Sequence, residues 1–142
     1  MVAYTILMEA KASQTNSNMI NFENFKADGQ SPIYQQILLY IKKGAVAGTI
    51  KDGDELPSRR NLSALLGINP NTVQKAFSQL EEEGLAISHS GAKSVMTLSS
   101  EKLAALRTEL LTEDIKNLTS SMKQMNISKE EAIKLIEENW SL

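Results

Sequence analysis

Residues 56–80 read LPSRRNLSALLGINPNTVQKAFSQL, and this stretch predicts two short helices joined by a tight turn. Gly67 suits the turn, because a sharp turn between helices often requires a positive φ that glycine adopts without strain. Ser63 and Ala64 offer the small side chains that two closely crossing helices need. The second helix is expected to bury one apolar stripe, formed by Val73, Ala76, Phe77 and Leu80. The arrangement predicts a helix-turn-helix, a motif typical of proteins that read DNA.

The start of each helix is marked by a capping residue. Asn69 is a good N-cap for the second helix, and Pro70 suits the first helical position, where no N–H group is needed. Ser58 is the expected cap of the first helix, which places Arg59 and Arg60 in its first turn. These residues lie at the two helix ends that such a motif presents to DNA.

The N-terminal part of the second helix also keeps a polar face outside the apolar stripe. Its candidates for base or phosphate contacts are Asn71, Thr72, Gln74 and Lys75. A helix-turn-helix inserts this end into the major groove, where an amide such as Gln74 can bond to an adenine edge. The plain alternatives are an exposed glutamine without a partner and, for Asn69, a capping role alone.

A β-hairpin is expected after the second helix, which Gly84 ends. Residues 85–88 and 95–98 are β-prone, and the segment HSGAK between them would close the hairpin. A helix-turn-helix followed by a hairpin is a winged helix. The predicted fold class is therefore mainly α with a small β-hairpin wing (α+β).

The stretch LPSRRNLSALLGINPNTVQKAFSQLEEEGL resembles the DNA-binding domain of GntR-type bacterial transcription regulators, whose pattern is roughly LPSxRxLAxxLGVxxxTVxxAxxxLexeGL. The NPNTV segment and the short tail behind it are most similar to the YtrA subfamily, and PIYQQI at residues 32–37 fits that subfamily's first helix. The resemblance runs from Met19 to the C-terminus. It implies a regulator that binds DNA, with Arg60 at the position of a family arginine that contacts it. The plain alternative for Arg60 is a solvated helix charge.

The wing departs from the family pattern. The family usually carries RxG or RRGxG at the minor groove, whereas this chain has His89, Ser90, Gly91, Ala92 and Lys93 at the matching positions. Because His and Ser replace the arginines, the resemblance implies a weaker wing, which Lys93 could partly restore through a phosphate contact. The wing residues expected at DNA are His89, Gly91 and Lys93. The plain alternative for His89 is a surface role.

Composition excludes several kinds of site. The 142 residues include no cysteine and one histidine, so thiol catalysis and sites rich in Cys or His are excluded, and a reducing cytoplasm is the natural compartment. The net charge of −2 counts against a general nucleic-acid binder. Residues 31–98 hold seven Lys or Arg against six Asp or Glu, whereas residues 99–142 hold six against eight. Within the first part, Arg59, Arg60, Lys75 and Lys93 fall where DNA is expected, and Glu81, Glu82 and Glu83 fall at the far end of the second helix. We expect sequence-dependent DNA binding that salt weakens quickly, with no metal and no cofactor.

The N-terminal residues 1–18 precede the region of resemblance. Their apolar run at residues 2–8 lacks a positively charged start and is too short to span a bilayer, so no signal peptide or membrane anchor is expected. Met19 resembles a natural start for this family. Residues 1–18 are then either a non-native extension or a flexible arm, and we predict no function for them.

Ser31 is expected to cap the first helix of the domain, with Pro32 at its first position and Gly48 at its end. The apolar face of that helix consists of Ile33, Ile37, Ile41 and Ala45. Residues 52–54, Asp-Gly-Asp, mark a turn. A calcium loop is excluded there because the remaining ligand positions do not follow.

A long helix begins at Ser99 and is ended by Asn126. It carries a narrow seam of the coiled-coil kind, formed by Leu111, Ile115, Leu118, Met122 and Met125. A second stripe near its start consists of Leu103, Leu106 and Leu110. Ser128 and Glu131 predict a capping box for a final helix, whose apolar face consists of Ala132, Ile133, Ile136 and Trp140. Two stripes predict two partners, the DNA-binding domain and a neighbouring chain.

Three segments are therefore expected: an N-terminal extension at 1–18, a winged helix-turn-helix DNA-binding domain at 19–98 and a helical dimerisation region at 99–142. The dimerisation residues are predicted to be Leu111, Ile115, Leu118, Met122, Met125, Ile133, Ile136 and Trp140. Only 44 residues follow the wing, too few to enclose a small molecule, so any effector would bind between subunits or domains.

The leading functional interpretation is a homodimeric regulator, acting as a repressor that occludes a promoter at a pseudo-palindromic operator. Resemblance to the YtrA subfamily also implies control of a nearby transporter operon. The alternative is a winged-helix protein-interaction module that does not bind DNA, a possibility that the acidic balance and the altered wing motivate. An enzyme is not expected, because the sequence offers no nucleophile with a base, carboxylate pair or phosphate loop.

Overall fold

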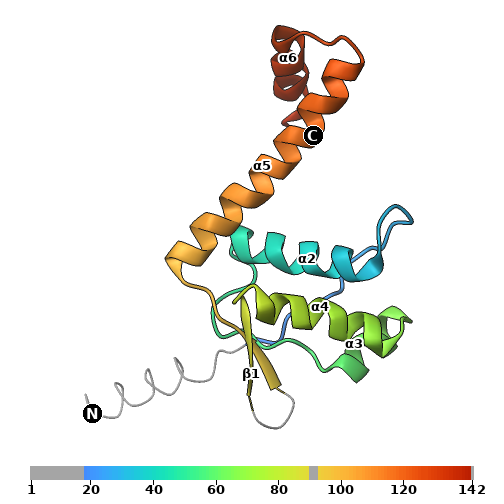
Figure 1. Cartoon of the computed structure of the whole chain (residues 1–142), viewed down its shortest axis with the longest axis vertical. Coiled ribbons are helices and arrows are strands. Elements are labelled where there is room, and N and C mark those ends of the chain that lie inside the picture. Colours follow the sequence, from blue (N-terminus) through green and yellow to red (C-terminus); the bar gives the residue numbers. More distant parts are fainter. Residues whose placement is uncertain (1–17, 90–92, 142) are drawn as a thin grey trace, which may run out of the picture. The chain divides into compact units, whose positions relative to one another are not determined.

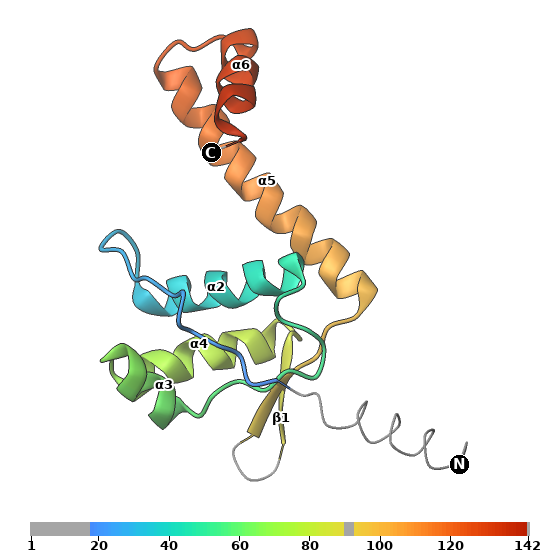
Figure 2. The ribbon, with the colours of Figure 1, turned by 180° about the vertical axis from the view of Figure 1, so that it is seen from behind.

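Three helices and a two-stranded sheet form the N-terminal part of the computed structural model, which describes residues 18–89 and 93–141. The helices are α2 (Ile33–Ala47), α3 (Arg59–Leu66) and α4 (Pro70–Glu82), and the antiparallel strands are β1 (Ala86–His89) and β2 (Lys93–Met96). Figures 1 and 2 both show α2 and α4 side by side, with α3 at the N-terminal end of α4 and the strands near its C-terminal end. The predicted winged helix-turn-helix is confirmed.

The core of this part lies between α2, α3, α4 and the sheet. Its largest fully buried side chains are Ile37, Ile41, Leu62, Leu80, Met96 and Val73. The predicted stripe of α4 is buried along its whole length, because Val73, Ala76, Phe77 and Leu80 are each at most 4% exposed. Burying one face of α4 leaves the opposite face available for other contacts.

Two local predictions in this core were wrong. Ser31 does not cap α2: Pro32 takes the N-cap position with an extended backbone (φ −56°, ψ 138°), and no side chain supplies a capping bond. Instead, the Gln36 side chain donates to the carbonyl of Ser31 at 2.7 Å and to that of Asp28 at 2.8 Å. Ala64 is exposed, so only Ser63 provides the small buried side chain predicted for α3.

The strands of the wing pair with the register Ala86↔Met96, Ile87↔Val95, Ser88↔Ser94 and His89↔Lys93. The predicted strands, 85–88 and 95–98, were therefore misplaced at their ends, and His89 and Lys93 belong to the ladder and not to the connection. The polypeptide between α2 and α3 lies along β2, because Gly53 N–H donates to the carbonyl of Met96 at 2.8 Å. Backbone pairing with a distant segment thus decides where the strands begin and end.

Two further helices follow, α5 (Ser100–Gln124) and α6 (Lys129–Asn139). Asn126 ends the first of them with a φ of 57°, as predicted, and the Ser128 hydroxyl accepts from the Glu131 N–H at 3.1 Å to cap the second. The chain divides into two compact units between Leu103 and Ala104. Within the described part of the chain, no helix combines the length and apolar content of a membrane span, and no cluster of three or more His, Cys, Asp or Glu could hold a metal ion.

Candidate nucleic-acid interface

The start of α4 is built as the sequence predicted. The Asn69 side chain accepts from the Asn71 N–H at 2.8 Å, and Pro70 occupies the first turn, where an N–H group would have no partner within the helix. The N-terminal end of a helix carries a partial positive charge and exposed N–H donors. This end of α4 is therefore suited to contact an anion such as a DNA phosphate.

The polar face of α4 carries the predicted base-reading candidates. Asn71 and Lys75 are exposed, and Thr72 and Gln74 are half-buried. The Gln74 amide nitrogen donates to the Ser78 hydroxyl at 2.7 Å, so the carbonyl oxygen is the better-placed atom of that side chain for a base. The Lys75 ammonium lies 4.0 Å from the centre of the Tyr34 ring, a cation–π contact that restricts its position.

The first turn of α3 adds two cations beside this face. The Ser58 hydroxyl accepts from the Asn61 N–H at 3.0 Å and caps α3, as predicted. Arg59 and Arg60 follow it and are both exposed. Across the described residues, neither guanidinium group has a salt bridge or hydrogen bond to a side chain. Both are therefore free to bind phosphates or base edges.

A hollow of about 540 Å³ joins these elements to the wing. It is lined by Pro57, Ser58, Arg59, Arg60, Pro70, Asn71, Gln74, Phe77, Glu81, Ser88 and Ser94. Six of the predicted contact residues thus share one concave surface. Asn69, Thr72, Lys75, His89 and Lys93 do not line it.

The wing carries two of its predicted contact residues within the described chain. His89 and Lys93 are exposed and pair with each other across the strands. The Lys93 ammonium lies 3.7 Å from a Glu55 carboxylate oxygen, and its side chain remains 71% exposed. Because an exposed ion pair of this kind is weak, Lys93 stays available to a phosphate. Gly91 lies outside the described residues.

Sequence reasoning missed the residues that connect α4 to the wing. Glu81, assigned to the far end of the helix from DNA, lines the same hollow as Arg59 and Arg60. Its carboxylate accepts from the hydroxyl of Ser88 on β1. The helical spacing of four and three residues from Gln74 through Ser78 to Glu81 was a usable sign that these side chains share one face.

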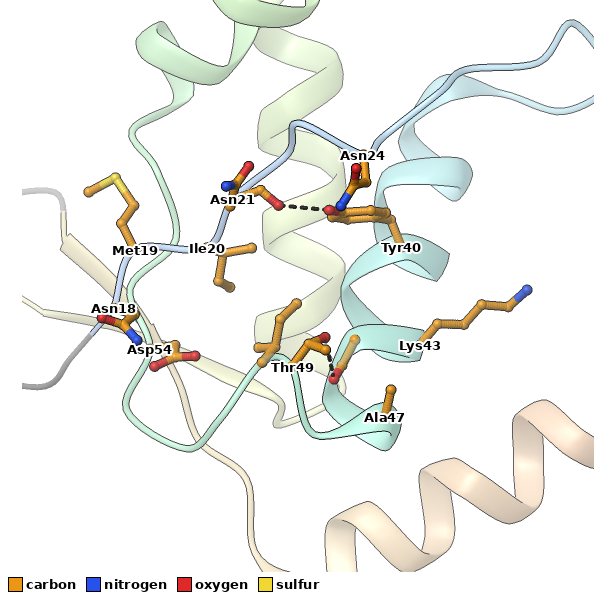
Figure 3. Close-up of a pocket in the computed structure, with 12 residues that line it drawn as sticks. Asn18, Met19, Ile20, Asn21, Asn24, Tyr40, Lys43, Ala47, Thr49 and Asp54 are labelled. Carbon is orange, nitrogen blue, oxygen red and sulfur yellow. Dashed lines mark hydrogen bonds between the residues drawn. The ribbon is translucent and has the colours of Figure 1, made fainter.

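A second hollow, of about 670 Å³, shares no residue with the first. It lies between the chain before α2, the end of α2 and the loop after it (Figure 3). The Tyr40 hydroxyl donates to the Asn21 carbonyl at 2.7 Å and that of Thr49 to the Gly44 carbonyl at 3.2 Å. Both hydroxyl groups are therefore bonded to the protein's own backbone.

The C-terminal unit exposes most of the residues predicted to form the dimer, which are the seam along α5 and three residues in or directly after α6. The exposed members are Leu111, Ile115, Leu118, Met125, Ile133, Ile136 and Trp140. Ile115 is 54% and Trp140 82% exposed, whereas Met122 is half-buried. Every described residue of α6 keeps part of its side chain accessible. Leu135, which the sequence did not single out, is also exposed.

The arrangement of a capped second helix, free arginines at the start of the first and an adjoining two-stranded wing defines a winged helix-turn-helix DNA-binding protein. Comparison with known proteins identifies the family within this class. The model of the family described as "Bacterial regulatory proteins, gntR family" matches residues 33–95. The chain is also 30% identical over 102 residues to the HTH-type transcriptional regulator YhcF of Bacillus subtilis, a match that covers 72% of this chain and 84% of that protein. The chain belongs to the gntR family of DNA-binding transcription regulators, which are not enzymes.

Two further relatives support this assignment. The HTH-type transcriptional repressor YtrA of Bacillus subtilis is 47% identical over 55 residues, which cover 39% of this chain and 42% of that protein. The chain thus matches less than half the length of YtrA. A GntR family transcriptional regulator from Listeria monocytogenes superposes with a TM-score of 0.72 at 32% identity, over 79% of this chain and 98% of that one. The similarity to YtrA-type members agrees with the predicted subfamily.

Proposed function

We propose that the chain represses transcription as a homodimer that binds a pseudo-palindromic operator through two copies of α4. The observation that carries this proposal is the exposed apolar seam of the C-terminal unit. Contiguous exposed apolar surface of this kind usually marks a protein interface. A second copy of the same helix offers a matching seam, and twofold self-association is the commonest way to cover one.

The DNA-contacting residues follow from the hollow and its rim. Asn71, Thr72 and Gln74 would face base edges in the major groove, and Arg59 and Arg60 would bind phosphates or bases beside them. The N-terminal end of α4, at Asn69 and Pro70, and that of α3, at Ser58, would approach the DNA backbone. Lys75, His89 and Lys93 would contribute beside the hollow, and Gly91 is proposed as a contact from the sequence alone.

Repression is supported by the similarity to YtrA, which is named as a transcriptional repressor. A dimer seated across a promoter would exclude other proteins from the same DNA. Control of a transporter operon rests on resemblance to the YtrA subfamily alone. The regulator would act in the cytoplasm, where the chromosome lies, and any small-molecule effector would bind between subunits or domains.

Sedimentation of the full chain tests the dimer. The change Ile115→Glu places a charge in the middle of the seam, where burial against a partner would be strongly unfavourable. We expect the unchanged chain to sediment as a dimer and the Ile115→Glu variant as a monomer with weak operator binding. Ser120→Glu, which adds the same charge to an exposed polar position of α5, is the matched control and should remain dimeric. An unchanged chain that sediments as a monomer would contradict the proposal.

A further inference from the structure

One carboxylate reaches both strands of the wing. Glu81 lies in the last two turns of α4, and its Oε1 atom accepts from the Ser88 hydroxyl on β1. The Ser94 hydroxyl on β2 lies 3.5 Å from the same oxygen, and the two hydroxyl oxygens are 3.3 Å apart. Ser88 and Ser94 are also register partners in the ladder. The three side chains therefore form a triangle that joins the recognition helix to the middle of the hairpin, which we call the Glu81 clamp.

Electrostatics alone does not explain a carboxylate at this position. Glu81 lines the same hollow as Arg59 and Arg60, which the proposed function places against DNA. A negative charge there repels phosphates, so a purely electrostatic design would place a neutral or basic residue at 81. The carboxylate does, however, accept hydrogen bonds from hydroxyl groups, and bonds to a charged acceptor are stronger than neutral ones.

The wing has few other attachments to α4 along its length. At its base, Leu85 N–H donates to the carbonyl of Leu80 in α4 at 2.9 Å, and the Leu85 carbonyl accepts from the Thr97 N–H at 2.9 Å, which closes the base of the hairpin itself. Beyond the base, Ile87, Ser88 and His89 are exposed. A short two-stranded ribbon is only marginally rigid by itself. The Leu56 N–H also donates to the Ser94 carbonyl at 2.9 Å, so β2 is joined to the loop before α3. Among the described residues, the clamp is the contact that joins the outer part of the wing, where Lys93 pairs with His89, to α4 by hydrogen bonds.

We propose that Glu81 is a positioning residue that holds the wing at a fixed distance from the recognition helix. The wing and the start of α4 then engage the same DNA together, with Lys93 placed to reach a phosphate while Asn71 and Gln74 face the bases. This proposal rests on the proposed function in requiring DNA binding by the wing, but it does not require a dimer.

The experiment measures DNA affinity against salt concentration for the full chain. The probe is a DNA duplex from the region immediately upstream of the gene that encodes the chain. In the unchanged chain, Lys93→Ala should reduce the slope of log affinity against log salt by about 0.9 for each Lys93 that contacts a phosphate. In a Glu81→Ala background, the same Lys93→Ala change should leave the slope nearly unaltered, because the wing no longer holds Lys93 in place.

Three further variants separate positioning from charge and from folding. Glu81→Gln keeps an oxygen acceptor for the serine hydroxyls and should restore the effect of Lys93→Ala on the slope. A Ser88→Ala, Ser94→Ala double variant removes the partners without changing α4 and should behave like Glu81→Ala. Glu82→Ala removes a neighbouring exposed carboxylate and is the matched control, which should leave the Lys93 effect intact.

Thermal unfolding by circular dichroism should show each variant folded at the assay temperature. The positioning proposal is overturned if Lys93→Ala does not change the salt slope when Glu81 is present. It is also overturned if Lys93→Ala changes the slope equally with and without Glu81. Equal affinity gains in Glu81→Gln and Glu81→Ala would overturn it too, since Glu81 would then act only through its charge. If the unchanged chain does not bind DNA at all, the proposed function is overturned, and the positioning role of Glu81 in DNA binding is overturned with it.

Discussion

Arg60→Ala gives the sharpest test of the candidate interface. Arg60 is exposed, lines the hollow with Asn71 and Gln74, and has a guanidinium group without a side-chain partner in the described chain. The substitution therefore breaks no side-chain bond of the folded state, and we expect no more than about 0.5 kcal/mol change in the free energy of unfolding. A loss of DNA affinity would then report directly on contact with DNA.

The expected loss of DNA affinity depends on how many Arg60 side chains contact the DNA. A base-reading contact is worth about 1 to 3 kcal/mol, and a dimer would lose two such contacts. We expect Arg60→Ala to weaken binding of the upstream duplex by about 2 to 6 kcal/mol for the dimer. Its affinity for unrelated DNA should fall much less, because that binding depends on phosphates.

Fluorescence anisotropy with the upstream duplex and with a scrambled duplex measures both affinities. Arg107→Ala is the matched control, because it removes an exposed arginine that does not line the hollow. Unchanged affinity for the upstream duplex in a folded Arg60→Ala variant would refute the reasoning and remove Arg60 from the interface. An equal loss on both duplexes would reassign it to a phosphate contact.

The other predictions concern salt, stability and assembly. The dimer should show a slope of log affinity against log salt of about −4 to −7, since four to eight phosphates at about 0.9 each are within reach of its basic residues; a slope near zero in a salt titration would mean that the hollow does not face DNA. Asn69→Ala should lower the free energy of unfolding by about 1 kcal/mol in urea denaturation, because the capping bond to the Asn71 N–H is lost; an unchanged value would show that the cap adds nothing. Truncation after Leu103, at the boundary between the units, should leave a folded monomer by sedimentation with much weaker operator binding, and a truncated chain that stays dimeric would place the interface elsewhere.

The parts of the fold that depend on neighbouring residues were predictable from the sequence. Ser58 and Asn69 cap their helices because each side chain bonds to a backbone N–H two or three residues away, so the pattern contains the whole interaction. The stripe of α4 was predictable for the same reason, since helical spacing fixes which side chains share a face. Ser31 failed as a cap because Pro32, the next residue, occupies the N-cap position itself.

The parts that depend on distant segments were not predictable. The ends of β1 and β2 are set by pairing across the wing and by the loop before α3, neither of which is encoded in local β propensity. The Glu81 clamp joins residues seven and thirteen positions apart, through a helix end and a hairpin whose register the sequence did not give. Glu81 was therefore read as a charge far from DNA, although it lines the same hollow as the arginines.

Selection of binding sites from random DNA by the full chain tests the central claim most directly. A homodimer that reads DNA through two copies of α4 should enrich an inverted repeat whose half-site centres are separated by about one helical turn, roughly 10 base pairs, or a multiple of it. Binding by the Ile115→Glu variant under the same conditions should enrich a single half-site weakly or nothing. Enrichment of an unrepeated sequence by the unchanged chain, or no enrichment at all, would contradict the account.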